Sequence, residues 1–168
     1  MSIGIVEFDA TNISFTKGRF GCWVYVSSYT VNSSDFSPFY VYSIEPNQGA
    51  TLWLTYLPST PTLGFGFWDD AGSYIYYEDT VSLSLDHWYF IELSWNHVGT
   101  PSYHLYVGSL ERTIIIIDQE GIPVLTGTAE DLDIGGIGGD DVIDIRMQNI
   151  LFSNLDTRDL YALRGEGY

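Results

Sequence analysis

The strongest constraint on the fold comes from two alternating segments near the middle of the chain. Residues 86–95 read DHWYFIELSW, and residues 102–108 read SYHLYVG. Apolar and polar residues alternate in both, which is the period of a β-strand with one face against a core. Between them, residues 96–101 contain Asn, Gly and Pro, which favour turns. The two segments therefore predict a hairpin of an antiparallel sheet.

Short apolar and β-branched runs of the same kind recur along the rest of the chain. Turn-forming residues bound each run, as strands joined by turns require. The further runs begin near Ile5, Phe20, Phe39, Thr51, Leu63, Ser73, Arg112, Pro123, Leu132 and Val142. With the hairpin they make roughly ten to thirteen strands, the number expected of two stacked antiparallel sheets.

Helical signal is confined to residues 154–164, NLDTRDLYALR, where Asp156 or Thr157 could cap a short helix. No linker, repeat or low-complexity tract interrupts the chain, and its 168 residues suit one β-sandwich. We therefore expect residues 1–168 to form a single all-β domain. Its fold class is a two-sheet antiparallel β-sandwich with at most one short C-terminal helix.

Charge and composition exclude several classes of partner. The chain has 22 acidic and six basic residues, and its net charge of -16 repels phosphate backbones and anionic lipid surfaces. No window is long enough to span a membrane, and the N-terminus lacks the pattern of a secretory signal peptide. We expect no nucleic-acid and no membrane partner, and a soluble protein made in the cytoplasm.

The cysteine and histidines indicate no transition-metal site. Cys22 is the only cysteine, which excludes a disulfide within the chain, and its apolar surroundings favour a small buried hydrophobe. His87, His97 and His104 lack the spacing of metal ligands on a strand or helix. We therefore expect no cofactor of this kind.

Calcium is the better metal hypothesis, because it prefers the oxygen ligands that acidic loops supply. None of these loops has a recognised calcium-binding motif, so we assign no metal ligand and keep a structural calcium as an alternative. The acidic positions are Asp69, Asp70, Asp131, Asp133, Asp140, Asp141 and Asp144.

Three segments, in this order, resemble a laminin-G-like domain of the concanavalin A-like lectin and glucanase superfamily. They are RFGCWVYV at residues 19–26, the hairpin, and LDIGGIGG followed by RMQNILFSNLDTRDL. The resemblance implies a jelly roll that is a binding platform more often than a catalyst. It also implies calcium held by an acidic residue of the closing strand, but this chain has the uncharged Gln148 there.

Some relatives of that fold hydrolyse polysaccharides with paired carboxylates, and the laminarinase-like ones carry Glu-x-Asp-x-x-Glu on one strand. That motif is missing here. Glu7 with Asp9 and Asp131 with Asp133 share a face, yet neither pair has a third acidic residue in register. Glu92 lies on the face of its strand away from the core, where a solvated charge is expected. We therefore expect that the protein is not an enzyme and has no catalytic residue. A glycoside hydrolase is the least favoured hypothesis.

Aromatic residues carry the remaining functional signal. If they line one sheet surface, they form a flat platform of the kind that stacks on sugar rings. Aromatic cross-strand pairs also stabilise sheets without any ligand, and Tyr-rich faces occur at protein interfaces, so these alternatives stay open. The candidate ligand-binding residues are Trp53, Tyr74, Tyr76, His104 and Tyr106.

Residues 114–117 are four consecutive isoleucines, so two of them must face away from any one-sided core. We expect this run to be buried within the chain, as the most apolar strand usually is. The alternative is contact with another subunit, including a second copy in a homo-oligomer.

Two functions fit these observations. The first is a non-enzymatic structural or adhesion protein on the surface of a virus-like (phage) particle, such as a capsid decoration or fibre protein with a lectin-like fold. Its partners would be other virion subunits and glycans, and it would reach the virion surface without a signal peptide. The second is a stand-alone carbohydrate-binding module or lectin, with an extracellular location as the alternative.

Overall fold

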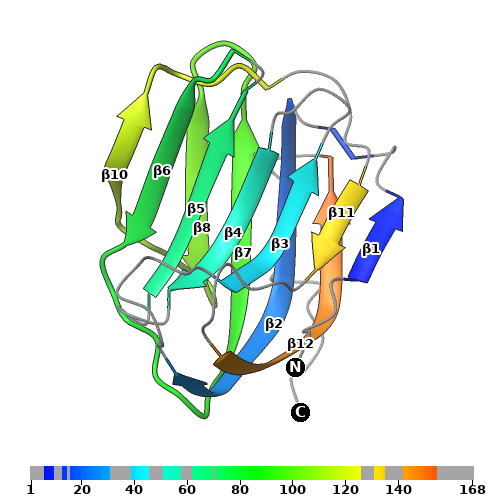
Figure 1. Cartoon of the computed structure of the whole chain (residues 1–168), viewed down its shortest axis with the longest axis vertical. Helices are drawn as coiled ribbons and strands as arrows, with labels where there is room; N and C mark the ends of the chain where they lie inside the picture. Colours follow the sequence, from blue (N-terminus) through cyan, green and yellow to red (C-terminus); the bar gives the residue numbers. More distant parts are fainter. Residues whose placement is uncertain are drawn as a thin grey trace.

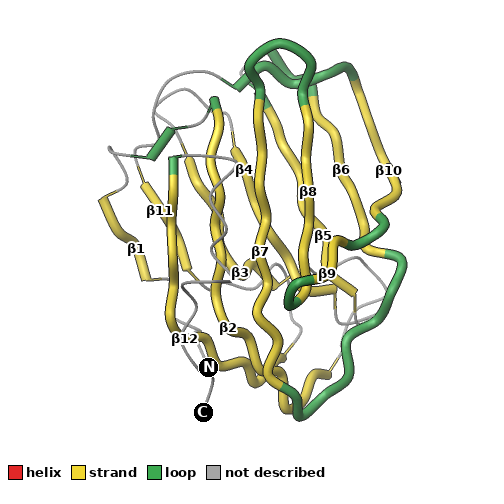
Figure 2. Tube along the Cα trace, turned by 180° about the vertical axis from the view of Figure 1, so that it is seen from behind, coloured by secondary structure: helices red, strands yellow, loops and turns green. Residues whose placement is uncertain are grey.

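The computed structural model describes residues 6–9, 13–14, 16–30, 39–45, 51–57, 62–69, 71–125, 131–134 and 142–154. Side chains are described for residues 13–14, 16–28, 62–69, 71–125 and 146–154. The described residues form twelve β-strands and no helix. Two antiparallel sheets face each other across a shared core, as Figures 1 and 2 show from opposite sides. The expected all-β sandwich is confirmed, whereas the helix expected after residue 154 lies outside the described residues.

One sheet has seven strands, and every neighbouring pair in it is antiparallel. In spatial order the strands are β1 (Val6–Asp9), β11 (Asp131–Ile134), β3 (Phe39–Glu45), β4 (Thr51–Leu57), β5 (Thr62–Trp68), β6 (Tyr74–Asp79) and β10 (Ile114–Glu120).

The other sheet has five strands in the order β12 (Val142–Ser153), β2 (Lys17–Thr30), β7 (Trp88–Asn96), β8 (Ser102–Val107) and β9 (Leu110–Glu111). The hairpin predicted from the sequence is β7 and β8, in which Asn96 pairs with Ser102 and Glu92 pairs with Tyr106. It lies within the five-stranded sheet, which is nearer the viewer in Figure 2.

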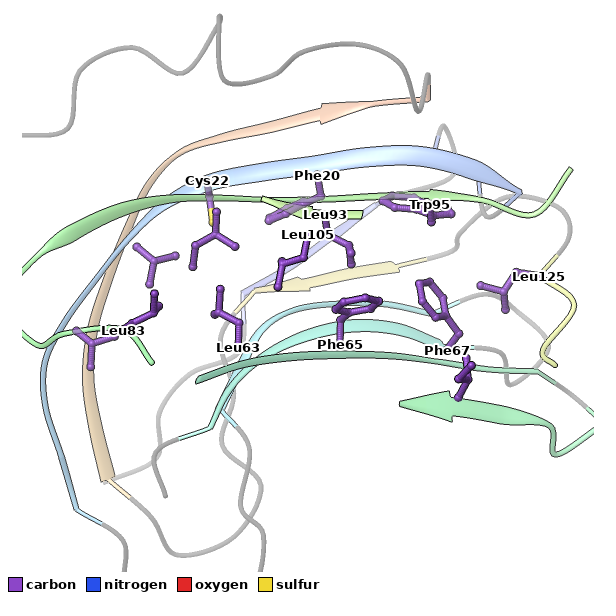
Figure 3. Packing of buried hydrophobic residues seen from close by; sticks show 14 residues of the cluster. Phe20, Cys22, Leu63, Phe65, Phe67, Leu83, Leu93, Trp95, Leu105 and Leu125 are labelled. Carbon is purple, nitrogen blue, oxygen red and sulfur yellow. The ribbon is translucent and has the colours of Figure 1, made fainter. Parts of the chain in front are cut away.

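The core forms between the sheets because alternate residues of each strand point inward. Figure 3 shows Phe20, Cys22, Leu93 and Trp95 on one side, opposite Phe65 and its neighbours on the other. Cys22 is fully buried, and burial raises the pKa of its thiol to about 12, so it stays a protonated apolar side chain as expected. Within the described part of the chain, no helix is long and apolar enough to cross a membrane.

One predicted strand is wrong. The run beginning at Pro123 is irregular through residue 125, although Leu125 packs into the core. The amide of Val124 donates a hydrogen bond to Oδ2 of Asp69 at 3.0 Å, and proline has no N–H for a strand ladder. A side-chain acceptor therefore replaces a neighbouring strand here.

The predicted burial of the isoleucine run is also wrong. β10 is the last strand of the seven-stranded sheet and lies outside β6 at the rim of the molecule (Figures 1 and 2). Ile115, Ile116 and Ile117 are 49%, 52% and 43% exposed. Sequence hydrophobicity indicated a central strand, but the order of the strands places this one at an edge.

Candidate ligand-binding site

The five residues predicted to form one platform lie in two different sheets. Trp53 belongs to β4, and Tyr74 and Tyr76 belong to β6, both in the seven-stranded sheet. His104 and Tyr106 belong to β8 in the five-stranded sheet. The prediction that all five residues line one continuous platform is therefore wrong. Alternation identifies the face of a strand on which a residue lies, but not the sheet to which the strand belongs. Ligand binding by either group stays a prediction.

The group in the seven-stranded sheet has little accessible aromatic surface among its described side chains. Tyr76 is only 9% exposed. Tyr74 is partly exposed, and its hydroxyl donates a hydrogen bond to Oδ1 of Asp118 at 3.3 Å. The backbone of Trp53 pairs with Gly66, which pairs in turn with Tyr76, but the side chain of Trp53 lies outside the described residues. Tyr74 is therefore the more accessible of the two described rings.

In the five-stranded sheet, His104 and Tyr106 border a hollow of about 220 Å³ where β2, β7 and β8 run side by side. In the strand register Ser94 lies between Arg19 and His104. These positions alternate with the core residues of their strands, so the hollow is on the outer face of the sheet. Its lining residues are Arg19, Ser94, Trp95, Asn96, Ser102, His104 and Tyr106.

A buried ion pair lies beside the hollow. Nη1 of Arg19 is 2.7 Å from Oε1 of Glu92, and their side chains are 12% and 3% exposed. The sequence predicted a solvated charge at Glu92, and this prediction is wrong although the side chain does face away from the core. The guanidinium provides the opposite charge that a buried carboxylate requires.

Arg19 also contacts the aromatic ring of Tyr106. Its Cζ lies 5.3 Å from the ring centroid, within the range of a cation–π contact. The pKa of the Tyr106 hydroxyl is raised by burial first and then by the nearby carboxylate of Glu111, while Arg19 acts in the opposite direction. The hydroxyl therefore stays protonated at neutral pH and can donate a hydrogen bond to a ligand.

His104 is the more open ring at the hollow. Its Nδ1 lies 2.6 Å from Oε1 of Glu111, and the two side chains are 45% and 55% exposed. The ring centroids of His104 and Tyr106 are 6.4 Å apart, with 28° between their planes. The two rings together present an aromatic surface next to polar side chains.

The chemistry of the hollow suits a ligand with both an apolar face and hydroxyl groups. Ser94, Asn96 and Ser102 supply neutral donors and acceptors around the two rings. Arg19 is paired with Glu92, and Glu111 adds a further negative charge. This balance disfavours an anionic ligand.

His104 and Tyr106 were predicted from the sequence, whereas the polar side chains that lie beside them in the hollow were not. Ser94 and Asn96 follow Glu92 at intervals of two along β7, so their common face was readable from alternation. The position of Arg19 beside Ser94 could not be predicted from the sequence. β2 is far from β7 along the chain, and their pairing is a tertiary contact.

A second aromatic group lies further along the same outer face. The ring of Trp23 meets that of Phe90 edge-on at 5.7 Å, and the rings of Tyr25 and Trp88 are 5.3 Å apart. The guanidinium Cζ of Arg146 lies 5.6 Å from the Tyr25 ring centroid. None of these residues was named as a candidate from the sequence.

The described residues contain no group of three or more His, Cys, Asp or Glu side chains that could hold a metal ion. Both carboxylate oxygens of Asp69, one of the predicted calcium positions, accept backbone hydrogen bonds. Oδ1 accepts from Ala71 and Ser73 at 3.0 and 2.9 Å, and Oδ2 accepts from Val124. Asp69 therefore organises a turn. The side chains of the remaining predicted calcium positions lie outside the described residues.

The two acidic pairs considered for hydrolysis lie on β1 and β11, the first two strands at one end of the seven-stranded sheet. β1 and β11 pair so that Glu7 is opposite Asp133 and Asp9 is opposite Asp131, but their side chains lie outside the described residues. At the hollow itself, Glu92 and Glu111 flank Tyr106 in the strand register. Each of these two carboxylates already contacts a basic side chain.

Comparisons with known proteins identify the fold. No protein-family model and no curated protein matches the chain. Among solved structures, the receptor-binding domain of botulinum neurotoxin type G aligns with a TM-score of 0.58 and 12% identity, over 94% of this chain and 43% of that one. This chain thus spans less than half of that domain.

Two further structures cover more of their own length. A SAP-like pentraxin from Limulus polyphemus aligns with a TM-score of 0.56 and 14% identity, over 90% of this chain and 70% of that one. The galectin LEC-6 from Caenorhabditis elegans aligns with a TM-score of 0.50 and 10% identity, over 86% and 91%. The chain therefore has the lectin-like jelly-roll fold of these structures, as the sequence resemblance implied.

Proposed function

We propose that this chain is a non-enzymatic carbohydrate-binding protein that holds an uncharged sugar at the hollow beside His104 and Tyr106. The main observation behind the proposal is that two aromatic rings and the polar side chains of Ser94 and Asn96 line the same hollow. An aromatic ring stacks on the apolar face of a sugar, while neutral donors and acceptors bind its hydroxyls.

The fold supports this proposal. The similar structures include a galectin and several toxin receptor-binding domains, so the scaffold serves recognition in proteins of different origin. An alginate lyase also shares the fold, with a TM-score of 0.50 and 9% identity, so the scaffold alone does not exclude catalysis. The choice rests on the side chains of the hollow.

Those side chains favour binding over hydrolysis. Glycoside hydrolysis needs one carboxyl as an acid and another as a base or nucleophile, both free to reach the glycosidic bond. Glu92 is buried in its ion pair with Arg19, and Glu111 contacts His104. A glycoside hydrolase is therefore the least favoured function, and release of reducing sugar from a β-glucan would contradict the choice.

The test is retention on a glycan array, followed by titration calorimetry with the best glycan. Tyr106→Ala removes one ring of the hollow and should weaken binding at least about tenfold, a loss of roughly 1.4 kcal/mol. His104→Ala should weaken it as well. Tyr74→Ala is the matched control, because it makes the same change on the other sheet.

The outcomes separate the two groups of predicted residues. Loss of binding in Tyr106→Ala with an unchanged Tyr74→Ala protein supports the hollow. The reverse pattern would move the site to the seven-stranded sheet. Failure of the folded wild-type protein to bind any glycan would refute the proposed function.

The second candidate function is attachment to a larger particle, with the chain acting as a decoration or fibre protein at the surface of a virus-like (phage) particle. The exposed isoleucines of β10 favour it, because a solitary domain rarely leaves such an edge strand open. Carbohydrate binding is compatible with this role, since a displayed domain can bind glycans at its other sheet. Sedimentation with particles from the producing cell tests it, and recovery only in the unbound fraction would count against it.

A further inference from the structure

The edge of the seven-stranded sheet ends in an apolar strand. β10 pairs with β6 on one side and is the terminal strand among those that the structure describes. Such a strand presents backbone N–H and C=O groups along its open side. Ile115, Ile116 and Ile117 are about half exposed, so the strand offers backbone pairing and apolar contact together.

Two further apolar residues are exposed after the end of the strand. Ile122 and Val124, which follow β10, are 60% and 67% exposed. Ile115, Ile116 and Ile117 are consecutive, and contiguous exposed apolar residues mark interaction sites more often than isolated ones do. β10 has no lysine or proline, residues with which native edge strands avoid pairing. A bulge between Ile116 and Asp118 is its one irregularity.

Charge identifies the kind of partner. Asp118 and Glu120 are exposed at the end of β10, and the ion pairs of the described residues involve neither of them. A second copy of this chain would bring another net charge of -16, which opposes association. A partner with positive charge near this end of the strand gains attraction instead.

We propose that β10 is the docking edge for an extended segment of another protein, which adds to the sheet as an antiparallel strand. This inference deepens the second candidate function, attachment to a larger assembly. The segment carries lysine or arginine opposite Asp118 and Glu120, followed by β-branched residues opposite Ile115 to Ile117. Antiparallel addition matches every strand pair described in this sheet.

The experiment uses the whole chain and two fluorescein-labelled peptides, KTRVIVT and its charge-reversed counterpart ETEVIVT, in fluorescence anisotropy. KTRVIVT places basic residues at the acidic end of β10 when the strands are antiparallel. We expect wild-type protein to bind KTRVIVT at least tenfold more tightly than ETEVIVT. The preference should shrink as salt is raised, because exposed charges are screened.

Three variants locate the binding. Replacing Ile115 and Ile117 together by lysine should weaken KTRVIVT binding at least tenfold. The charge reversal Asp118→Lys with Glu120→Lys should switch the preference to ETEVIVT. Val98→Lys is the control, because Val98 is 60% exposed in the loop between β7 and β8 and lies outside the edge strand. Circular dichroism and thermal melting confirm that each variant is folded.

Several results would overturn the proposal. These are no binding of KTRVIVT to the folded wild-type protein, equal binding by the double-lysine variant, or an unchanged preference after charge reversal. Sedimentation velocity of the chain alone should give a monomer. A dimer that the double-lysine variant abolishes would make a second copy the occupant instead. The peptide assay contains no particles. Loss of peptide binding at β10 can therefore be distinguished from failure of the chain to attach to a particle, which the sedimentation experiment measures.

Discussion

The guanidinium of Arg19 and the carboxylate of Glu92 form an ion pair on the outer face of the five-stranded sheet, with 2.7 Å between Nη1 and Oε1. The two residues come from neighbouring strands, β2 and β7, and both are largely withdrawn from solvent. A charge in such a position is stable only with its partner in place. The pair therefore links the stability of the sheet to the shape of the hollow beside Tyr106.

Breaking the Arg19–Glu92 pair should destabilise the fold. Glu92→Gln leaves the guanidinium without its counter-charge and should lower the free energy of unfolding by about 3 kcal/mol. Urea denaturation monitored by tryptophan fluorescence measures this. The double variant Arg19→Met with Glu92→Gln should be more stable than either of its single variants, because it leaves no buried charge unpaired. Strictly additive losses would show that the two side chains do not interact energetically.

The buried imidazole of His97 should make the fold less stable in acid. Burial lowers its pKa from 6.5 to about 4, and the backbone of Pro123 opposes the shift slightly. The unfolded chain therefore takes up a proton at a higher pH than the folded one. The contribution of neutral His97 to stability is complete above pH 6.5 and is lost progressively as the pH falls from 6.5 through 4, by about 2 kcal/mol because solvent screens the partly exposed ring.

The measurement is the free energy of unfolding of wild-type protein and His97→Phe between pH 7 and pH 4. The phenyl ring can occupy the site between Phe67 and Tyr103, whose ring centroids lie 5.4 and 5.3 Å from that of the imidazole. Carboxylates titrate in both proteins, so the difference between their curves isolates the histidine. Parallel curves would mean that His97 is protonated as readily in the folded state as in the unfolded one.

Removing the hydroxyl of Tyr103 should stabilise the protein. This hydroxyl is buried and has no hydrogen-bond partner among the described residues, and burial raises its pKa strongly. An unsatisfied buried polar group costs roughly 1–3 kcal/mol, so Tyr103→Phe should raise the free energy of unfolding by about 1 kcal/mol. Tyr103→Leu should lower it, because the ring stacks on Phe67 at 4.2 Å. A Phe variant less stable than wild type would reveal a partner for the hydroxyl.

The carboxylate of Asp69 should be needed for the turn between β5 and β6. It accepts hydrogen bonds from three backbone amides, including that of Val124 more than fifty residues away. Asp69→Ala should lower the free energy of unfolding by about 3 kcal/mol, since the amides lose a charged acceptor. The exposed Glu120→Ala should change it by less than about 1 kcal/mol. Equal melting temperatures for the two variants would contradict this role.

Much of the fold was predictable because the strands carry their own local signals. Alternation located β7 and β8 and identified Glu92 as facing away from the core, and the turn residues between runs separated most strands correctly. The segment after Pro123 failed because an apolar run can be buried without a strand partner, as Leu125 is. The local sequence pattern of a segment indicates its apolar character and its period, but it does not indicate which groups its backbone will form hydrogen bonds with.

The candidate site was predictable only in part. His104 and Tyr106 were named correctly as neighbours because they share a face of one strand. Their association with Tyr74 was wrong because β6 and β8 belong to different sheets. Arg19 entered the site only through the pairing of β2 with β7.

By itself, the sequence determined the all-β class, the hairpin and the alternation that assigns each residue to one face of its strand. These properties depend on the two-residue period of a strand and on the turn preferences of short segments. Only the tertiary structure decided which strands are neighbours. That order places the isoleucines of β10 at an open edge and brings Arg19, Glu92 and Tyr106 together, because contacts between strands depend on the packing of the whole chain.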